Sequence, residues 1–196
     1  MKKILIIALF GLFSSTLFGQ AESMWALTYN MSFPMGATKD YISKASFRGI
    51  ALDGRWFVDN NVTLGGSLGW NVFYEKEDKA TISKENLTLN GTQWKYINAV
   101  PMYFNAAYYL NEGSYVRPYF AANIGTIYTA RRTEMGLYAL TDKEWKFAVA
   151  PEIGVTIQTY NSINVMFNLR YNYGLETQYI DPLSYLGVNV GILWTY

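Results

Sequence analysis

The sequence predicts an all-β fold, an eight-stranded antiparallel up-and-down transmembrane β-barrel. Three observations predict it. Apolar and polar residues alternate with a period of two in eight successive segments, and the connections between these segments alternate between short and long. Aromatic residues gather near both ends of the segments, whereas the centres are mostly aliphatic. This pattern is typical of strands that cross a bilayer with one face toward lipid.

The first 21 residues have the features of a secretory signal peptide. Two lysines precede an apolar stretch from Ile4 to Phe13, and small and polar residues follow it up to Ala21. The apolar stretch is about ten residues long, whereas a spanning helix needs about 20, which argues against an uncleaved anchor. We expect cleavage after Gly19 or after Ala21, since both place a small residue at the cut. The barrel domain is then predicted over residues 22–196.

The eight predicted strands follow one another along the rest of the chain. In the last of them, large apolar residues at every second position oppose small or amide residues such as Gly187, Asn189 and Gly191. Helical spacing would scatter these two sets around an axis, whereas a strand places them on opposite faces. The predicted strands are Trp25 to Phe33, Phe47 to Val58, Val62 to Phe73, Trp94 to Leu110, Tyr115 to Thr129, Trp145 to Tyr160, Ile163 to Tyr173 and Leu186 to Tyr196.

The alternation is weakest in the fourth predicted strand, because both of its faces carry large apolar residues. We expect Asn105 to point inward, since an amide is costly to expose to lipid. The outward face is then predicted to hold Val100, Met102, Phe104 and Tyr108, and the inward face Pro101, Tyr103, Asn105 and Tyr109.

The connections predict which ends of the strands share a rim of the barrel. Tight turns of the expected residue types are Asp59 to Asn61, Asn111 to Ser114 and Asn161 to Ser162. The long connections carry many of the charges, and no helix is predicted in them. Because Asn90-Gly91 lies between alternating segments, we expect the third and fourth strands to continue as a hairpin outside the bilayer. The long connections are Pro34 to Lys44, Tyr74 to Gln93, Ala130 to Glu144 and Gly174 to Leu183.

Side-chain size decides which face of the strands points outward. An eight-stranded barrel has room inside only for side chains or one small ligand. The face that contains Gly65, Gly125 and Gly191 fits this narrow lumen, and the face rich in Leu, Val, Ile, Trp and Phe does not. In water the bulky face would be an aggregation surface far larger than the few hundred Å² usually tolerated. A soluble lipocalin-like carrier, whose apolar faces point inward, is therefore the less favoured alternative.

These residues resemble a known family, the small outer-membrane β-barrels of the OmpX and OmpA-barrel type. The most specific part is the last strand, where Ile192, Trp194 and Tyr196 look like the carboxy-terminal aromatic signal read by the barrel assembly machinery. Tyr196 stands where Phe is the commoner family residue. The resemblance implies export to the outer membrane of a Gram-negative cell, in contact with its lipids and lipopolysaccharide. It implies little about activity.

Composition excludes several classes of function. The chain has no His and no Cys, so a Ser-His-Asp triad, a thiol nucleophile and a Cys/His zinc site cannot form. A G-x-S-x-G match from Gly65 to Gly69 lies inside a predicted strand, whereas the nucleophile elbow needs a strand-to-helix turn and a histidine. We predict no catalytic, cofactor or metal site. The formal net charge of +1 gives no reason to expect nucleic acid.

Five charged residues are predicted on the inward face: Asp53, Arg55, Arg117, Glu152 and Arg170. Glu152 and Arg170 lie at nearly the same height above one tight turn on adjacent strands, which predicts an ion pair between them. Arg117 is expected near the short-turn rim. Charges in a narrow interior must be paired, so this network is expected to plug the lumen. A gate that opens a narrow path is the alternative interpretation.

The predicted role is structural or surface-interacting, without catalysis. The alternative is a narrow channel or port for small apolar molecules. The charged long connections are expected either to form a solvated rim or to contact lipopolysaccharide, another cell or a protein partner.

Overall fold

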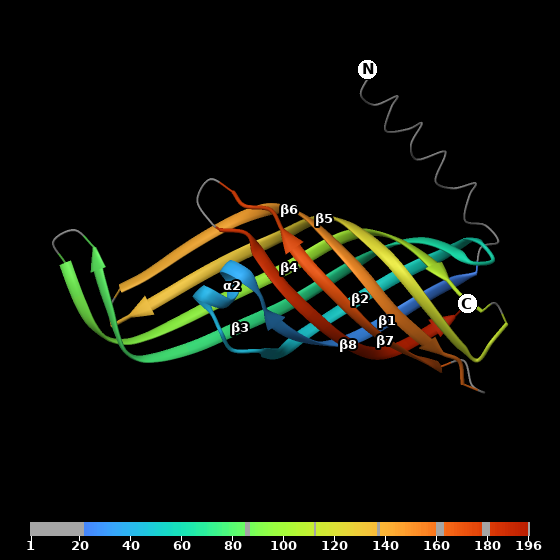
Figure 1. Cartoon of the computed structure of the whole chain (residues 1–196), viewed down its shortest axis with the longest axis horizontal. Helices are drawn as coiled ribbons and strands as arrows, with labels where there is room; N and C mark the ends of the chain where they lie inside the picture. Colours follow the sequence, from blue (N-terminus) through green and yellow to red (C-terminus); the bar gives the residue numbers. More distant parts are fainter. Residues whose placement is uncertain are drawn as a thin grey trace, which may run out of the picture.

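The computed structural model describes residues 22–84, 87–111, 113–136, 138–159, 163–177 and 181–195. Within these ranges the chain forms a closed barrel of eight strands in sequence order (Figure 1). The predicted signal peptide (residues 1–21), the predicted turn Asn161 to Ser162, and Tyr196 lie outside the described residues.

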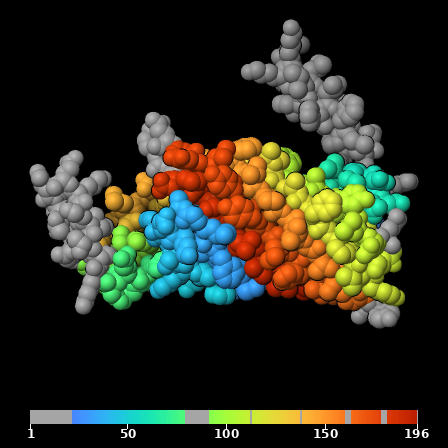
Figure 2. Space-filling view, in the orientation of Figure 1, coloured from blue at the N-terminus to red at the C-terminus, as the bar shows by residue number. Residues whose placement is uncertain are grey.

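Each strand pairs antiparallel with the next, which confirms the predicted fold class. The ring closes between the first and last strands, where every residue from Met24 to Pro34 on β1 has a partner from Thr195 to Tyr185 on β8. Figure 2 shows these strands, blue and red, side by side in the barrel wall. The strands are β1 Ser23–Pro34, β2 Ser46–Asp59, β3 Val62–Lys84, β4 Leu87–Tyr109, β5 Val116–Met135, β6 Tyr138–Ile157, β7 Ile163–Gly174 and β8 Leu183–Thr195.

The two faces of the strands are occupied as the alternation predicts. Leucine, isoleucine, valine and aromatic side chains are exposed on the outer wall of all eight strands. Glycines, amides and hydroxyls line the interior. In β4 the favoured assignment is confirmed, because Met102 and Phe104 are exposed while Tyr103 and Asn105 are buried.

Two buried apolar clusters also fill the interior, one toward each end of the barrel. The cluster near the short turns includes Met24, Tyr109, Tyr119 and Leu193. The cluster near the long connections contains large aliphatic and aromatic side chains, whereas the sequence predicts mainly small and amide residues on the inward face. Its residues are Ile42, Phe73, Ile97, Ala99, Tyr103, Ile127, Ala148, Ala150, Leu183 and Tyr185.

Two of the predicted long connections are largely strand, which corrects the sequence prediction. β3 and β4 continue as a hairpin to the pair Lys84↔Leu87, and β5 and β6 continue to the pair Met135↔Tyr138. The hairpin beyond β3 and β4 was predicted, but Asn90 pairs with Thr81 inside it and is not at its turn. Because Gln93 pairs with Met135, the two hairpins form one four-stranded extension, seen at the left of Figure 1.

A short helix, α2 (Gly36–Tyr41), lies in the first long connection, where no helix was predicted. Contacts with β8 hold it in place: Ser184 N donates to Thr38 Oγ1 at 2.8 Å, and Met35 N donates to Ser184 O at 2.9 Å. Ile42, directly after the helix, is completely buried in the apolar cluster at this end. The helix segment therefore covers the mouth of the barrel. No helix in the described part of the chain is long and apolar enough to cross a bilayer.

Candidate functional site

Four of the five predicted interior charges meet near mid-height in the barrel. Asp53 and Arg55 extend from β2, Glu152 from β6 and Arg170 from β7. Alternate residues of a strand point to the same face, so the parity of these positions turns all four side chains inward. Each residue is between 2 and 4% exposed. We call these four residues the interior charge cluster.

Glu152 is the centre of the cluster. Its Oε1 accepts hydrogen bonds from Arg55 Nη2 at 2.8 Å and from Tyr119 Oη at 2.7 Å. Its Oε2 accepts from Arg170 Nε at 2.7 Å and from Asn123 Nδ2 at 3.1 Å. Each carboxylate oxygen therefore accepts from two donors, an arrangement that favours the ionised form of Glu152.

Arg170 extends the cluster across the lumen. Its Nη2 donates to Asp53 Oδ1 at 2.7 Å and its Nη1 to Ser67 Oγ at 2.9 Å. Since Ser67 and Asp53 belong to β3 and β2, this one guanidinium links the wall at β7 with the wall on the other side. Arg55 completes the crossing, because its Nη1 donates to Tyr109 Oη at 3.0 Å.

The cluster is electrically balanced. Two guanidinium groups face two carboxylates, which offsets much of the cost of taking these charges out of water. The Arg55 guanidinium also lies 4.8 Å from the centroid of the Tyr119 ring. With the apolar clusters above and below it, this layer fills the lumen. Ion pairs join both carboxylates to the two guanidinium groups.

Arg117 lies apart from the interior charge cluster, at the short-turn rim where the sequence places it. Its Nη2 donates to Asn60 O at 3.1 Å. Its guanidinium lies 5.5 Å from the centroid of Phe57 and 5.3 Å from that of Tyr109. The structure therefore brings together the other four predicted residues and places Arg117 against rim aromatics.

A buried lysine toward the other end of the barrel escaped the sequence analysis. Lys146 points inward from β6, where its Nζ donates to Thr177 Oγ1 at 3.2 Å and lies 3.9 Å from Glu144 Oε2. The sequence does indicate the inward direction of Lys146, because this residue has the same parity as Ala148, Ala150 and Glu152. Lys146 is the second residue of the predicted strand Trp145 to Tyr160 and directly follows the charged connection Ala130 to Glu144.

The predicted assembly residues and the motif-like glycines lie on the barrel wall. Ile192 faces outward from β8, and Trp194 pairs with Trp25 and Ile163 near the short-turn end. Tyr196 is outside the described residues. The Gly65 to Gly69 segment lies within β3, with no strand-to-helix turn. Among the residues that the structure describes, no three Asp or Glu side chains converge to hold a metal ion.

Ion pairs on the four-stranded extension are exposed to solvent. Lys95 Nζ lies 2.9 Å from Glu77 Oε2, and Lys76 Nζ lies 2.9 Å from Asp78 Oδ1. The hydrogen bond from Lys76 lowers the pKa of Asp78 below its ordinary value. Lys76, Glu77 and Asp78 keep the β3 edge of the extension charged, which opposes pairing with other chains through this edge.

No protein-family model and no curated protein matches the sequence. Solved structures do match it. Neisserial surface protein A (NspA) is 12% identical with a TM-score of 0.54, over 90% of this chain and 97% of that one. The N-terminal β-barrel domain of Pseudomonas aeruginosa OprF gives the same identity and score, over 90% and 100%. Ail, the attachment invasion locus protein of Yersinia pestis, is 13% identical with a TM-score of 0.51, over 89% and 99%. The chain therefore has the fold of the small eight-stranded outer-membrane β-barrels.

Proposed function

We propose that the protein is an integral protein of the Gram-negative outer membrane, with a structural or surface-interaction role and no catalytic activity. The apolar outer wall supports the location, because large hydrophobic side chains are exposed on every strand. Hydrocarbon would favour this surface, whereas water would not. The closed ring supports it as well, since closure leaves no strand edge without hydrogen-bond partners in lipid.

The filled lumen is the observation that carries the role. The interior charge cluster occupies the middle of the barrel, and buried apolar side chains pack on both sides of it. A channel for small apolar molecules would need a continuous path past Glu152 and Arg170, which hold each other at 2.7 Å. The packing therefore favours a sealed barrel over the narrow channel.

The four-stranded extension supports a role in surface contact. It continues the barrel wall beyond the aromatic residues at the ends of the spanning strands, with its backbone paired as far as Met135↔Tyr138. Tyr138 and Leu140 are exposed on β6 within it. A paired sheet presents such side chains at low entropic cost. We propose two kinds of partner. Lipid and lipopolysaccharide headgroups contact the barrel, and a surface ligand binds this extension.

Membrane fractionation tests the location, and planar bilayers test the sealed lumen. We expect the protein in the detergent-extracted membrane fraction, migrating faster on electrophoresis without prior heating than after it. In planar bilayers we expect no persistent conductance. Recovery in the periplasmic fraction would contradict the location, and a persistent open state would favour the channel.

A shortened extension tests the surface role. Glu77 pairs with Gln93, so a two-residue Asn-Gly turn can join them in place of residues 78–92. We expect this variant to reach the membrane and keep its heat-dependent migration, while bacteria that express it adhere less to immobilised proteins and polysaccharides than bacteria with the full chain. Equal adhesion would contradict a surface role for this hairpin.

A further inference from the structure

A β-bulge in β2 turns Arg48 toward the outside of the barrel. Asn30 pairs with Gly49 and Ser32 with Ser46, so β2 has one extra residue where β1 has only Met31. Phe47 and Arg48 consequently both point outward and are exposed. Tyr29 Oη donates to Phe47 O at 2.5 Å, which satisfies a carbonyl group at the bulge. Bulges often serve to redirect a side chain in this way.

The charge on Arg48 is unusual for its position. It lies on the outer wall two residues from Ile50, which pairs with Trp70, and its guanidinium is 5.9 Å from the centroid of the Tyr74 ring. Within the described ranges, no carboxylate lies within ion-pair distance of it. By contrast, Arg132 on the extension pairs with Glu134 at 2.5 Å. Arg48 is therefore an unneutralised cation beside the aromatic residues that mark the membrane boundary.

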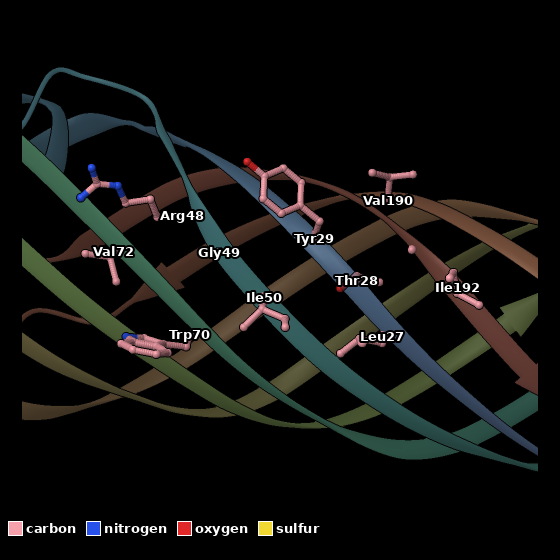
Figure 3. A pocket seen from close by; sticks show the side chains of 11 residues that line it. Leu27, Thr28, Tyr29, Arg48, Gly49, Ile50, Trp70, Val72, Val190 and Ile192 are labelled. Carbon is pink, nitrogen blue, oxygen red and sulfur yellow. The ribbon is translucent and has the colours of Figure 1, made fainter.

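An apolar groove begins at Arg48 and runs along the outer wall. Figure 3 shows Arg48 toward one end of it and Ile192 toward the other. Its volume is about 800 Å³, within the range of small-molecule sites, which is roughly 300–1,000 Å³. The backbone of Gly49 and Gly191 borders the groove. The apolar residues that line it are Leu27, Tyr29, Ile50, Trp70, Val72, Val190 and Ile192.

We propose that this groove binds one acidic membrane lipid, with its phosphate on Arg48 and an acyl chain along Ile50 and Leu27. Charge complementarity selects this occupant, because a free guanidinium above an apolar groove matches an anionic headgroup above a hydrocarbon chain. A neutral apolar molecule would leave Arg48 unpaired, and a soluble anion would leave the groove empty. The inference rests on the proposed membrane location.

Native mass spectrometry tests the site. The full chain is released from vesicles that contain equal amounts of phosphatidylglycerol and phosphatidylcholine with the same acyl chains. We expect the natural sequence to retain phosphatidylglycerol preferentially and Arg48→Gln to lower that preference about fivefold, the effect of one interfacial cation. Arg132→Gln removes an equal charge from the extension and should leave the preference unchanged. An equal preference in all three proteins would overturn the proposal.

A second variant tests the groove apart from the charge. Val190→Trp fills the groove and keeps Arg48, so retention of phosphatidylglycerol should fall although the headgroup partner remains. Unchanged retention would show that no acyl chain occupies the groove and would overturn that part of the proposal. Heat-dependent migration of each variant reports insertion. Failure of the natural sequence to insert would contradict the membrane location. Insertion of the natural sequence without a lipid preference would contradict only this inference.

Discussion

Glu152 and Arg170 are register partners on β6 and β7, and the same arginine reaches Asp53 on β2 across the lumen. The two contacts are both 2.7 Å long. A local pair between neighbouring strands is thus tied to the opposite wall by a single guanidinium. Neither wall can move away from the other without leaving a buried charge unpaired, which opposes deformation of the barrel cross-section.

Glu152→Gln should destabilise the barrel strongly. The substitution leaves Arg55 and Arg170 buried with one carboxylate between them, and breaking a buried pair costs about 3–5 kcal/mol. Urea unfolding in lipid vesicles, followed by tryptophan fluorescence, measures the loss. Glu77→Gln is the matched control, since it breaks an exposed pair with Lys95 worth about 0–1 kcal/mol. A loss no larger than that of the control would contradict the role of the cluster in stability.

Gly65→Ala should destabilise the barrel, and Gly66→Ala should not. A Cβ at Gly65 would lie 2.0 Å from Gly54 O and 2.9 Å from Arg55 Cα, so the backbone beside the cluster would have to shift. A Cβ at Gly66 would meet only Tyr103 O at 3.4 Å, an ordinary contact. We expect a loss of about 1–3 kcal/mol for the first, the usual cost of overpacking, in the same unfolding measurement. Equal stability of the two variants would mean that the strands separate easily at this point.

The sequence predicts the faces of the strands but not every interior contact. Alternation places Glu152 and Arg170 on the inward face. The number of residues between each of them and the turn that joins their strands places them at nearly the same height. The contact between Arg170 and Asp53 depends on the stagger with which the whole ring closes, and no single strand encodes that stagger. The inward Phe73 and Ile97 lie inside the predicted strands, at the ends next to a long connection, and the prediction assigned no face to either residue.

The hairpin beyond β3 and β4 was predicted without its length, and the hairpin beyond β5 and β6 and the α2 helix were not predicted, for a different reason. Outside a bilayer both faces of a strand contact water, so the period of two that reveals spanning strands disappears around Glu75 and Asp78. The α2 helix has six residues, fewer than the roughly 12–15 that form a stable helix alone. It depends on Ser184, which lies far away in the sequence and contacts it only in the closed barrel.

Ile42→Ala should loosen the segment over the mouth without unfolding the barrel. Ile42 is completely buried in an apolar cluster, and the segment around it contains two trypsin sites, Lys39 and Lys44. Removing its side chain leaves a cavity and weakens the local anchor, so local opening should become more frequent. We expect severalfold faster tryptic cleavage at these lysines, detected by mass spectrometry, with unchanged heat-dependent migration. Met35→Ala, at an exposed neighbouring side chain, should cleave at the rate of the natural sequence.

Tyr196→Ala should impair assembly in the cell more than stability. Sequence alternation gives Tyr196 the same parity as Ile192 and Trp194, and we propose that the three form the signal read by the assembly machinery. We expect the heat-modifiable, assembled fraction in cells to fall severalfold. Refolding of the purified variant into detergent, which needs no such signal, should match that of the natural sequence. Tyr138→Ala removes an exposed tyrosine from the extension and should assemble normally. Should refolding in detergent fall in parallel with assembly in cells, the residue acts on stability and the proposed signal is wrong.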